Sequence, residues 1–183
     1  MTLTSHDTDF GDSLRAMAPA LAHSGQVRTV FNSFPAAVGA LCAKIDGQPQ
    51  GLVATSLSIG TSFDPPMTLF SVRKESSTWP SLRAAPRLGI SVLGEGQGEL
   101  CRQISSRSGD RFANVHTTVT EHGAVFVEGA ATWLDCEIAH EMPAGDHTVV
   151  IFEIHSVGHN RATPPLVFHN GSFPRLERNT GAQ

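Results

Sequence analysis

The sequence predicts a mainly β protein with a few helices, arranged as a small antiparallel barrel. About six or seven short β-rich runs follow one another closely, and only two or three segments have helical periodicity. Many strands at short spacing favour an antiparallel barrel over a doubly wound α/β fold. A chain of 183 residues with 40% apolar and 16% charged residues is large enough to bury one core.

The chain is predicted to consist of an extension, one domain and a tail. Residues 1–24 form a flexible or helical extension, residues 25–174 the barrel domain, and residues 175–183 a polar tail. Apolar residues over 14–21 indicate a short helix within the extension. Over 27–34, apolar residues recur at i, i+3, i+4 and i+7, which predicts a second helix that ends at a proline.

Turn residues divide the first half of the barrel into strands. A strand over 36–45 is expected to return over 51–59 after a turn at Asp46-Gly47, because glycine tolerates positive φ. Asp64-Pro65-Pro66 cannot continue a sheet ladder, so it predicts a turn before a strand over 67–72.

The rest of the chain alternates short helices with longer β-rich runs. Ser77 or Thr78 is expected to cap a short helix that tolerates Pro80 in its first turn and is closed by Pro86. The other predicted elements are a strand at 88–93, a helix at 97–106, a loop at 108–115, β runs at 124–139 and 148–157 separated at 143–146, and a last strand at 166–168.

Composition and charge argue against several classes of protein. A net charge of −4 gives no basic footprint for nucleic acid, and no apolar run approaches the roughly 20 residues of a membrane span. The first residues lack the basic start and apolar run of a secretory signal. Cys42, Cys101 and Cys136 are widely spaced and odd in number, which is typical of a reducing compartment. We therefore expect a soluble, cytoplasmic protein.

Several motifs of catalytic and metal sites are missing. The chain has no G-x-G-x-x-G after a strand, no P-loop, no H-E-x-x-H and no G-x-S-x-G. Nine histidines raise the question of a metal site. His155 and His159 fall on a predicted strand, which puts them on one face but roughly 13 Å apart, too far for one ion. No metal site is predicted.

The most informative segment is residues 51–79. Thr55, Ser56 and Ser58 place three hydroxyls in an otherwise apolar strand, and the next strand ends in Arg73-Lys74 followed by the hydroxyl run 76–78. Cations, hydroxyls and free backbone N–H groups at a helix start favour an anion such as phosphate. An exposed sheet face and an ordinary capped helix with a solvated basic turn explain the same residues, so both interpretations stay open.

A series of motifs continues from this segment in a fixed order. They are FPAAVGALCAKIDGQPQGLVATSLSIGTSFDPPMTLFSVRKESSTW, SVLGEGQGEL, Gly-Asp-Arg-Phe at 109–112, ATWLDCEIAHEMPAGDHTVVIFEI and PPLVFHNGSF. Over roughly residues 26–173 the chain resembles the flavin reductase family, the reductase components of two-component flavin-dependent monooxygenases. This resemblance implies an antiparallel split β-barrel that binds flavin mononucleotide, usually as a homodimer. The chain departs from the family at Ala36-Ala37, where Thr-Gly is common, and at His169, where a Tyr is usual.

The resemblance implies a flavin site and a nicotinamide site. Residues expected against the flavin ring and its side chain are Gly51, Leu52, Val53, Thr55 and Ser56. Residues expected at the phosphate end are Ser71, Arg73, Lys74, Ser76, Ser77 and Thr78, with Ser105, Ser106 and Arg111 closing the pocket. His147 is the expected catalytic residue against the nicotinamide, bordered by His169 and Asn170. Two other interpretations stay open: Arg111 as an ion-pair partner of Asp110, and His147 as an ordinary turn residue.

The expected activity follows from the same resemblance. The chain is expected to transfer hydride from NADH or NADPH to FMN or FAD and to supply reduced flavin to a partner monooxygenase. Because the cofactors carry the redox chemistry, no catalytic dyad is required, and His147 would orient the nicotinamide. The alternatives are a non-catalytic flavin- or haem-binding carrier or sensor, and a flavin oxidase acting on a small substrate. The choices between FMN and FAD and between NADH and NADPH stay open.

Overall fold

A computed structural model describes residue 20 and residues 25–177, and the chain divides into two compact units, residues 1–34 and 35–183. In the first unit, α2 (Gly25–Asn32) confirms the helix predicted over 27–34. Ser33 N closes this helix by donating to the carbonyl oxygens of Thr29 and Val30. The helix predicted over 14–21 lies outside the described residues.

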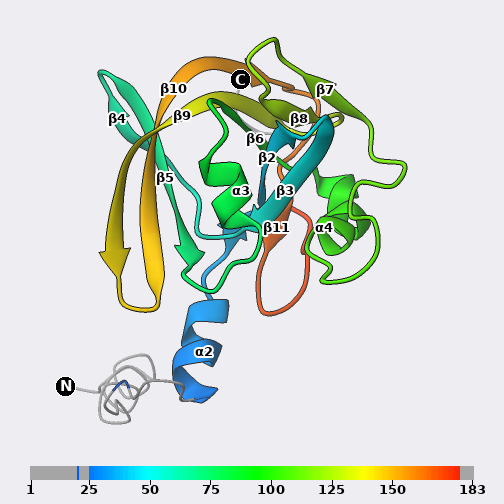
Figure 1. Cartoon of the computed structure of the whole chain (residues 1–183). Coiled ribbons are helices and arrows are strands. Elements are labelled where there is room, and N and C mark those ends of the chain that lie inside the picture. The colour runs from blue at the N-terminus through cyan, green and yellow to red at the C-terminus, as the bar shows by residue number, and fades with distance from the viewer. Residues whose placement is uncertain (1–19, 21–24, 178–183) are drawn as a thin grey trace, which may run out of the picture. The chain divides into compact units, whose positions relative to one another are not determined.

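Within the described residues, the second unit is built around a seven-stranded antiparallel sheet (Figure 1). Its strands in spatial order are β3 (Gln48–Ala54), β2 (Gly39–Ile45), β6 (Leu88–Val92), β9 (Thr132–Ala144), β10 (His147–His159), β5 (Pro66–Arg73) and β4 (Ser58–Phe63). The long strands β9 and β10 join the β3-β2-β6 half to the β5-β4 half. The prediction of a mainly β, antiparallel fold is confirmed.

Two short strand pairs and three short helices complete the second unit as described. β1 (Ala36–Ala37) pairs with β11 (Val167–Phe168), and β7 (Thr117–Val119) pairs with β8 (Val125–Val127). The helices are α3 (Trp79–Arg83), the 3₁₀ turn η1 (Glu95–Gln97) and α4 (Gly98–Ile104). None of the helices in the described part of the chain has the length and apolar character of a membrane span.

Helix α3 is held in place by the larger of two core clusters. Trp79 and Leu82 are buried and pack with the inward side chains of the sheet. The ring of Phe70 on β5 lies 5.2 Å from the Trp79 ring and 5.6 Å from the Phe152 ring, centroid to centroid. Aromatic pairs at these separations are favourable beyond their buried area. The segment between β5 and α3 is therefore fixed at both ends.

Some predicted strand boundaries are wrong. The strand expected over 51–59 ends at Ala54, because Ser56 leaves the β2 ladder and bonds to the backbone of Ser71 on β5. The run expected over 124–139 is interrupted between β8 and β9, where Gly129 has φ 75°. β9 continues through Pro143 to Ala144, so the turn before β10 has only two residues, Gly145 and Asp146. β4 and β7 were not predicted, since both are short and largely exposed.

Candidate functional site

A cleft of about 980 Å³ opens between the ends of β3, β5 and β10 and the C-terminal end of α4. This volume is at the upper end of the range for small-molecule sites. The lining residues are Leu52, Val53, Ala54, Thr55, Ser56, Phe70, Ser71, Val72, Arg73, Glu75, Ser76, Ser77, Thr78, Ser105, Ser106, Arg107, Gly109, Arg111 and His147. The cleft thus brings together segments that are far apart in the sequence.

All but four of the residues predicted to bind flavin or nicotinamide line this cleft. The four exceptions are Gly51, Lys74, His169 and Asn170. The cleft includes residues from the ring, phosphate and closing groups, together with His147. What each of these residues binds stays a prediction.

Gly51 has a packing reason to be glycine. It lies opposite Cys42 in the β2–β3 ladder, and a Cβ at this position would meet Cys42 Sγ at 2.5 Å and the Leu41 carbonyl oxygen at 2.9 Å. The ring of Phe112 would lie 3.0 Å away. Since one of these neighbours is backbone, a larger residue cannot be accommodated without moving the strands.

The other three exceptions make local contacts away from the cleft. Lys74 Nζ donates to the Gly145 carbonyl oxygen at 2.6 Å, and Lys74 N donates to the Asp146 carbonyl oxygen at 3.1 Å, which ties the end of β5 to the β9–β10 turn. Asn170 has φ 49° and forms, with the next glycine, the turn that joins His169 to Ser172. His169 and Asn170 therefore lie in a tight turn near the C-terminal end of the described chain.

Hydroxyl groups follow the wall of the cleft, and some are already engaged. Ser56 Oγ donates to the Ser71 carbonyl oxygen at 2.9 Å and accepts from Ser71 N at 3.1 Å, so it joins the exit of β3 to β5. Ser76 Oγ accepts from Trp79 N at 3.2 Å and so caps the first turn of α3. The expected caps, Ser77 or Thr78, are wrong in this detail, since the Thr78 side chain makes no capping bond.

The cleft is positively charged where these hydroxyls lie. Three guanidinium groups, of Arg73, Arg107 and Arg111, line it against a single carboxylate, that of Glu75, among its described residues. Helix α3 has only five residues, so its macrodipole adds little to anion binding. The side-chain cations and hydroxyls therefore supply the attraction for an anion.

Arg111 is directed toward the hydroxyl run 76–78. Its Nη1 donates to Thr78 Oγ1 at 3.1 Å, and Gln103 Nε2 donates to the carbonyl oxygens of Arg111 and Ala113, which holds the loop. The alternative of an ion pair with Asp110 is not observed among the described residues, where Asp110 Oδ1 accepts from Phe112 N at 2.9 Å instead. Arg111 therefore belongs to the same charged end as Arg73.

His147 lies at the start of β10, where it pairs with Arg73 in the β5–β10 ladder, and it lines the cleft. Its Nδ1 is 2.7 Å from Asp146 Oδ1, and this hydrogen bond lowers the pKa of the Asp146 carboxyl. When Nδ1 donates to the carboxylate, Nε2 is the ring nitrogen that remains for a ligand. His147 is therefore both a turn residue and a cleft residue.

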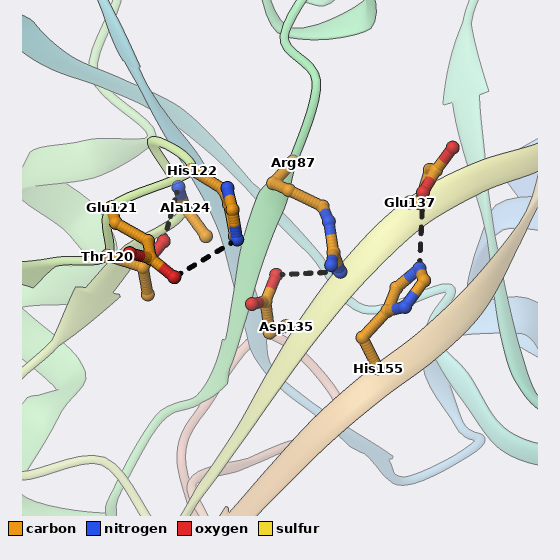
Figure 2. A network of polar contacts seen from close by, with 8 residues as sticks. All are labelled: Arg87, Thr120, Glu121, His122, Ala124, Asp135, Glu137 and His155. Carbon is orange, nitrogen blue, oxygen red and sulfur yellow. Dashed lines mark hydrogen bonds and ion pairs between the residues drawn. The ribbon is translucent and has the colours of Figure 1, made fainter.

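Two other histidines, His155 and His122, each pair with a glutamate. Figure 2 shows His155 on β10 beside Glu137 on β9, with Nε2 and Oε2 3.2 Å apart, and His122 beside Glu121. Arg87 and Asp135 form a further ion pair nearby, with Nη1 and Oδ1 3.4 Å apart (Figure 2). No group of three or more His, Cys, Asp or Glu residues in the described part is arranged to hold a metal ion.

Sequence reasoning missed some lining residues. They are Ala54, Phe70, Val72, Glu75, Arg107 and Gly109. Glu75 and Arg107 directly follow predicted site residues, so their position was a usable signal. Phe70 and Val72 were not detectable, because they are core residues whose strand also forms the cleft wall.

The residues present fit the flavin mononucleotide expected from the sequence. Leu52, Val53 and Phe70 give the cleft an apolar part for a flat aromatic ring. The arginines and hydroxyls give it a charged end for a phosphate, as Arg forks and hydroxyls do in phosphate sites.

Comparison with known proteins supports the same assignment. Residues 31–177 match the family model described as a flavin reductase like domain. The chain is 29% identical over 150 residues to the flavin-dependent monooxygenase reductase subunit HsaB of Rhodococcus jostii, over 82% of this chain and 76% of the relative. It is 31% identical over 157 residues to an NADH:FMN oxidoreductase of Rhodococcus erythropolis, over 83% and 81% of the two chains.

A solved structure has the same fold. The NADH:FAD oxidoreductase SgcE6 of Streptomyces globisporus, in complex with NAD and FAD fragments, superposes with a TM-score of 0.80 at 30% identity, over 89% of this chain and 99% of that chain. The split-barrel fold implied by the sequence motifs is confirmed. The chain belongs to the flavin reductase family.

Proposed function

We propose that the protein transfers hydride from NADH to FMN or FAD and supplies the reduced flavin to a partner flavin-dependent monooxygenase. The observation that carries this proposal is the cleft, which combines an apolar part, a hydroxyl-lined edge and three arginines in a chain of the flavin reductase family. The names of the relatives, an NADH:FMN oxidoreductase and a monooxygenase reductase subunit, support it.

The protein itself binds and positions the reactants. The redox chemistry would be supplied by a bound flavin, as the hydride acceptor. Arg73 and Arg111, with the hydroxyls of Ser77 and Thr78, hold the phosphate, while Leu52 and Val53 contact the ring. Fixing both ligands at contact distance is the main way in which such a site accelerates the reaction.

His147 is the residue proposed to position the nicotinamide. It lines the cleft at the start of β10, beside Arg73 at the end of β5. Its bond to Asp146 fixes the orientation of the imidazole ring, so Nε2 can donate to or accept from the nicotinamide amide. No proton transfer by His147 is required.

Further parts of the proposal rest on the resemblance to the family. We propose a homodimer that acts in the cytoplasm, with residues 25–174 as its flavin-binding domain. His169 and Asn170 lie in a turn outside the cleft of their own chain, and we propose that they border the nicotinamide.

Purified protein tests the proposal directly. The visible spectrum is recorded first, and NADH absorbance is then followed with FMN or FAD present and absent. Flavin-dependent oxidation of NADH is expected, as is stimulation of a flavin-dependent monooxygenase by the released flavin. A Soret band would instead identify a haem protein, and a stable yellow protein inert to NADH would identify a carrier.

A further inference from the structure

A second cleft, of about 410 Å³, adjoins the first at its charged end. Arg73 and Ser76 line both clefts. The other residues that line the second cleft are Lys74, Trp79, Pro80, Arg83, Glu141, Met142, Pro143 and Thr148. Helix α3 and the neighbouring ends of β5, β9 and β10 therefore line this cleft.

The neighbouring ends of β5 and β10 contribute residues to both clefts. His147 and Thr148 are consecutive on β10, and His147 lines the first cleft while Thr148 lines the second. On β5, Ser71, Val72 and Arg73 all line the first cleft, and Lys74, which follows them, lines the second. Arg73, which pairs with His147 in the β5–β10 ladder, reaches both. Because Arg73 and Ser76 line both clefts, a phosphate bound at Arg73 would lie where the two clefts meet.

The second cleft attracts anions. Arg73, Lys74 and Arg83 face one carboxylate, Glu141, which leaves two net positive charges. Glu141 Oε2 binds Arg83 Nε at 2.5 Å, and Glu141 Oε1 accepts from Trp79 Nε1 at 3.2 Å. Because the ion pair uses Nε, the two Nη groups of the largely exposed Arg83 side chain are left for a ligand.

The same cleft has a small apolar surface for a flat ring. Pro80 on α3 and Met142 and Pro143 on β9 are exposed and line it. Methionine adapts to the edges and faces of aromatic rings, and proline gives a rigid apolar face. A planar base with a phosphate attached therefore matches both the charge and the apolar surface.

We propose that the second cleft binds the adenylate half of FAD, and that the protein therefore prefers FAD to FMN. The inference rests on the proposed function, which puts the flavin phosphate at Arg73. FMN ends at that phosphate. FAD continues with a second phosphate and an adenosine, and these are the groups that Lys74, Arg83 and the apolar surface can receive.

The test measures dissociation constants for riboflavin, FMN and FAD by flavin fluorescence titration. Wild-type protein is expected to bind FAD about threefold to tenfold more tightly than FMN, the range for one partly exposed charged contact. Arg83→Ala is expected to remove most of this difference and to leave FMN affinity unchanged. Glu141→Gln keeps an acceptor for Trp79 but releases Arg83, so it is expected to increase FAD affinity alone.

Arg102→Ala is the matched control. Arg102 is as exposed as Arg83, with side chains 60% and 63% exposed, and it also pairs with a glutamate, Glu99. The Arg102→Ala variant removes one positive charge, as Arg83→Ala does, but from a residue that lines neither cleft. It is therefore expected to leave the affinity for each flavin unchanged. Equal wild-type affinity for FMN and FAD, or equal effects of Arg83→Ala on both, would overturn the inference.

Two other results separate this inference from its alternatives. A selective loss of NADPH affinity in Arg83→Ala, with FAD affinity unchanged, would assign the cleft to the nicotinamide dinucleotide and overturn the FAD assignment. Failure of wild-type protein to bind any of the three flavins would overturn the proposed function and the inference together. FMN-supported NADH oxidation without a preference for FAD would leave the function standing and overturn the inference alone.

Discussion

Replacing Arg111 with alanine is expected to weaken the binding of FMN but not that of riboflavin. Arg111 Nη1 already donates to Thr78 Oγ1 at 3.1 Å, so its guanidinium lies at the hydroxyl run of the cleft. A hydrogen bond to a charged group is worth about 1.5–3 kcal/mol when well formed. Arg111 is half-buried, so solvent screening reduces this to roughly 1–2 kcal/mol, or about fivefold to thirtyfold in Kd.

Two further variants separate charge from geometry. Arg111→Lys keeps the charge but loses the planar fork, so an intermediate affinity for FMN is expected. Thr78→Val is nearly isosteric and removes the hydroxyl that accepts from Arg111 and that is proposed to contact the phosphate, so a loss smaller than that of Arg111→Ala is expected, because the charge remains. Fluorescence titration with FMN and with riboflavin measures all three variants under the same conditions.

Riboflavin decides the interpretation, because it has the same ring but no phosphate. If Arg111→Ala weakens riboflavin as much as FMN, then Arg111 supports the ring or the fold of the loop rather than the phosphate. If FMN affinity does not change, then Arg111 acts only on Thr78. Either result refutes the reasoning that places the phosphate between Arg73 and Arg111.

Other predictions concern the nicotinamide, the packing of β3 and the thiols. His147→Ala is expected to raise the KM for NADH or to slow flavin reduction in stopped-flow experiments while flavin still binds; an unchanged rate and KM would contradict its role. Gly51→Ala is expected to cost about 1–3 kcal/mol in urea unfolding, whereas Gly96→Ala, with open space around it, is expected to cost little. Burial raises the pKa of Cys42 and Cys136 to about 12, so neither thiol should react with a thiol reagent at pH 8 until the protein unfolds. The unfolded thiols lose their protons first, so the unfolding free energy should fall as pH rises from about 9 toward 12.

Local chemistry in the sequence was sufficient to predict several turns. The hairpin at Asp46-Gly47 is confirmed, with φ values of 49° and 82°, because this pair suits a two-residue turn between strands. The turn is confirmed at Asp64 and Pro65, but Pro66, which was predicted to lie in it, begins β5 and pairs with Phe63, as a proline can at the first residue of a strand. Each of these features depends on a few adjacent residues.

Features that depend on distant contacts were not predictable in the same way. The end of β3 at Ala54 is set by the bond from Ser56 to Ser71, and nothing near Ser56 in the sequence reveals that partner. Gly51 was assigned to the flavin, yet its contacts with Cys42 and Phe112 already require a glycine. The sequence motifs identified the correct segment but did not separate packing from binding.

Arg73 and Lys74 show how register determines what a predicted residue can do. They are adjacent in the sequence and were assigned together to one phosphate. In the structure Arg73 pairs with His147 at the end of the β5–β10 ladder and lines both clefts, whereas Lys74 is bound to Gly145 and lines only the second cleft. FAD carries two phosphates and FMN only one. Because Arg73 and Lys74 are placed at different clefts, the comparison of FAD affinity with FMN affinity is the measurement that tests whether both clefts bind the flavin.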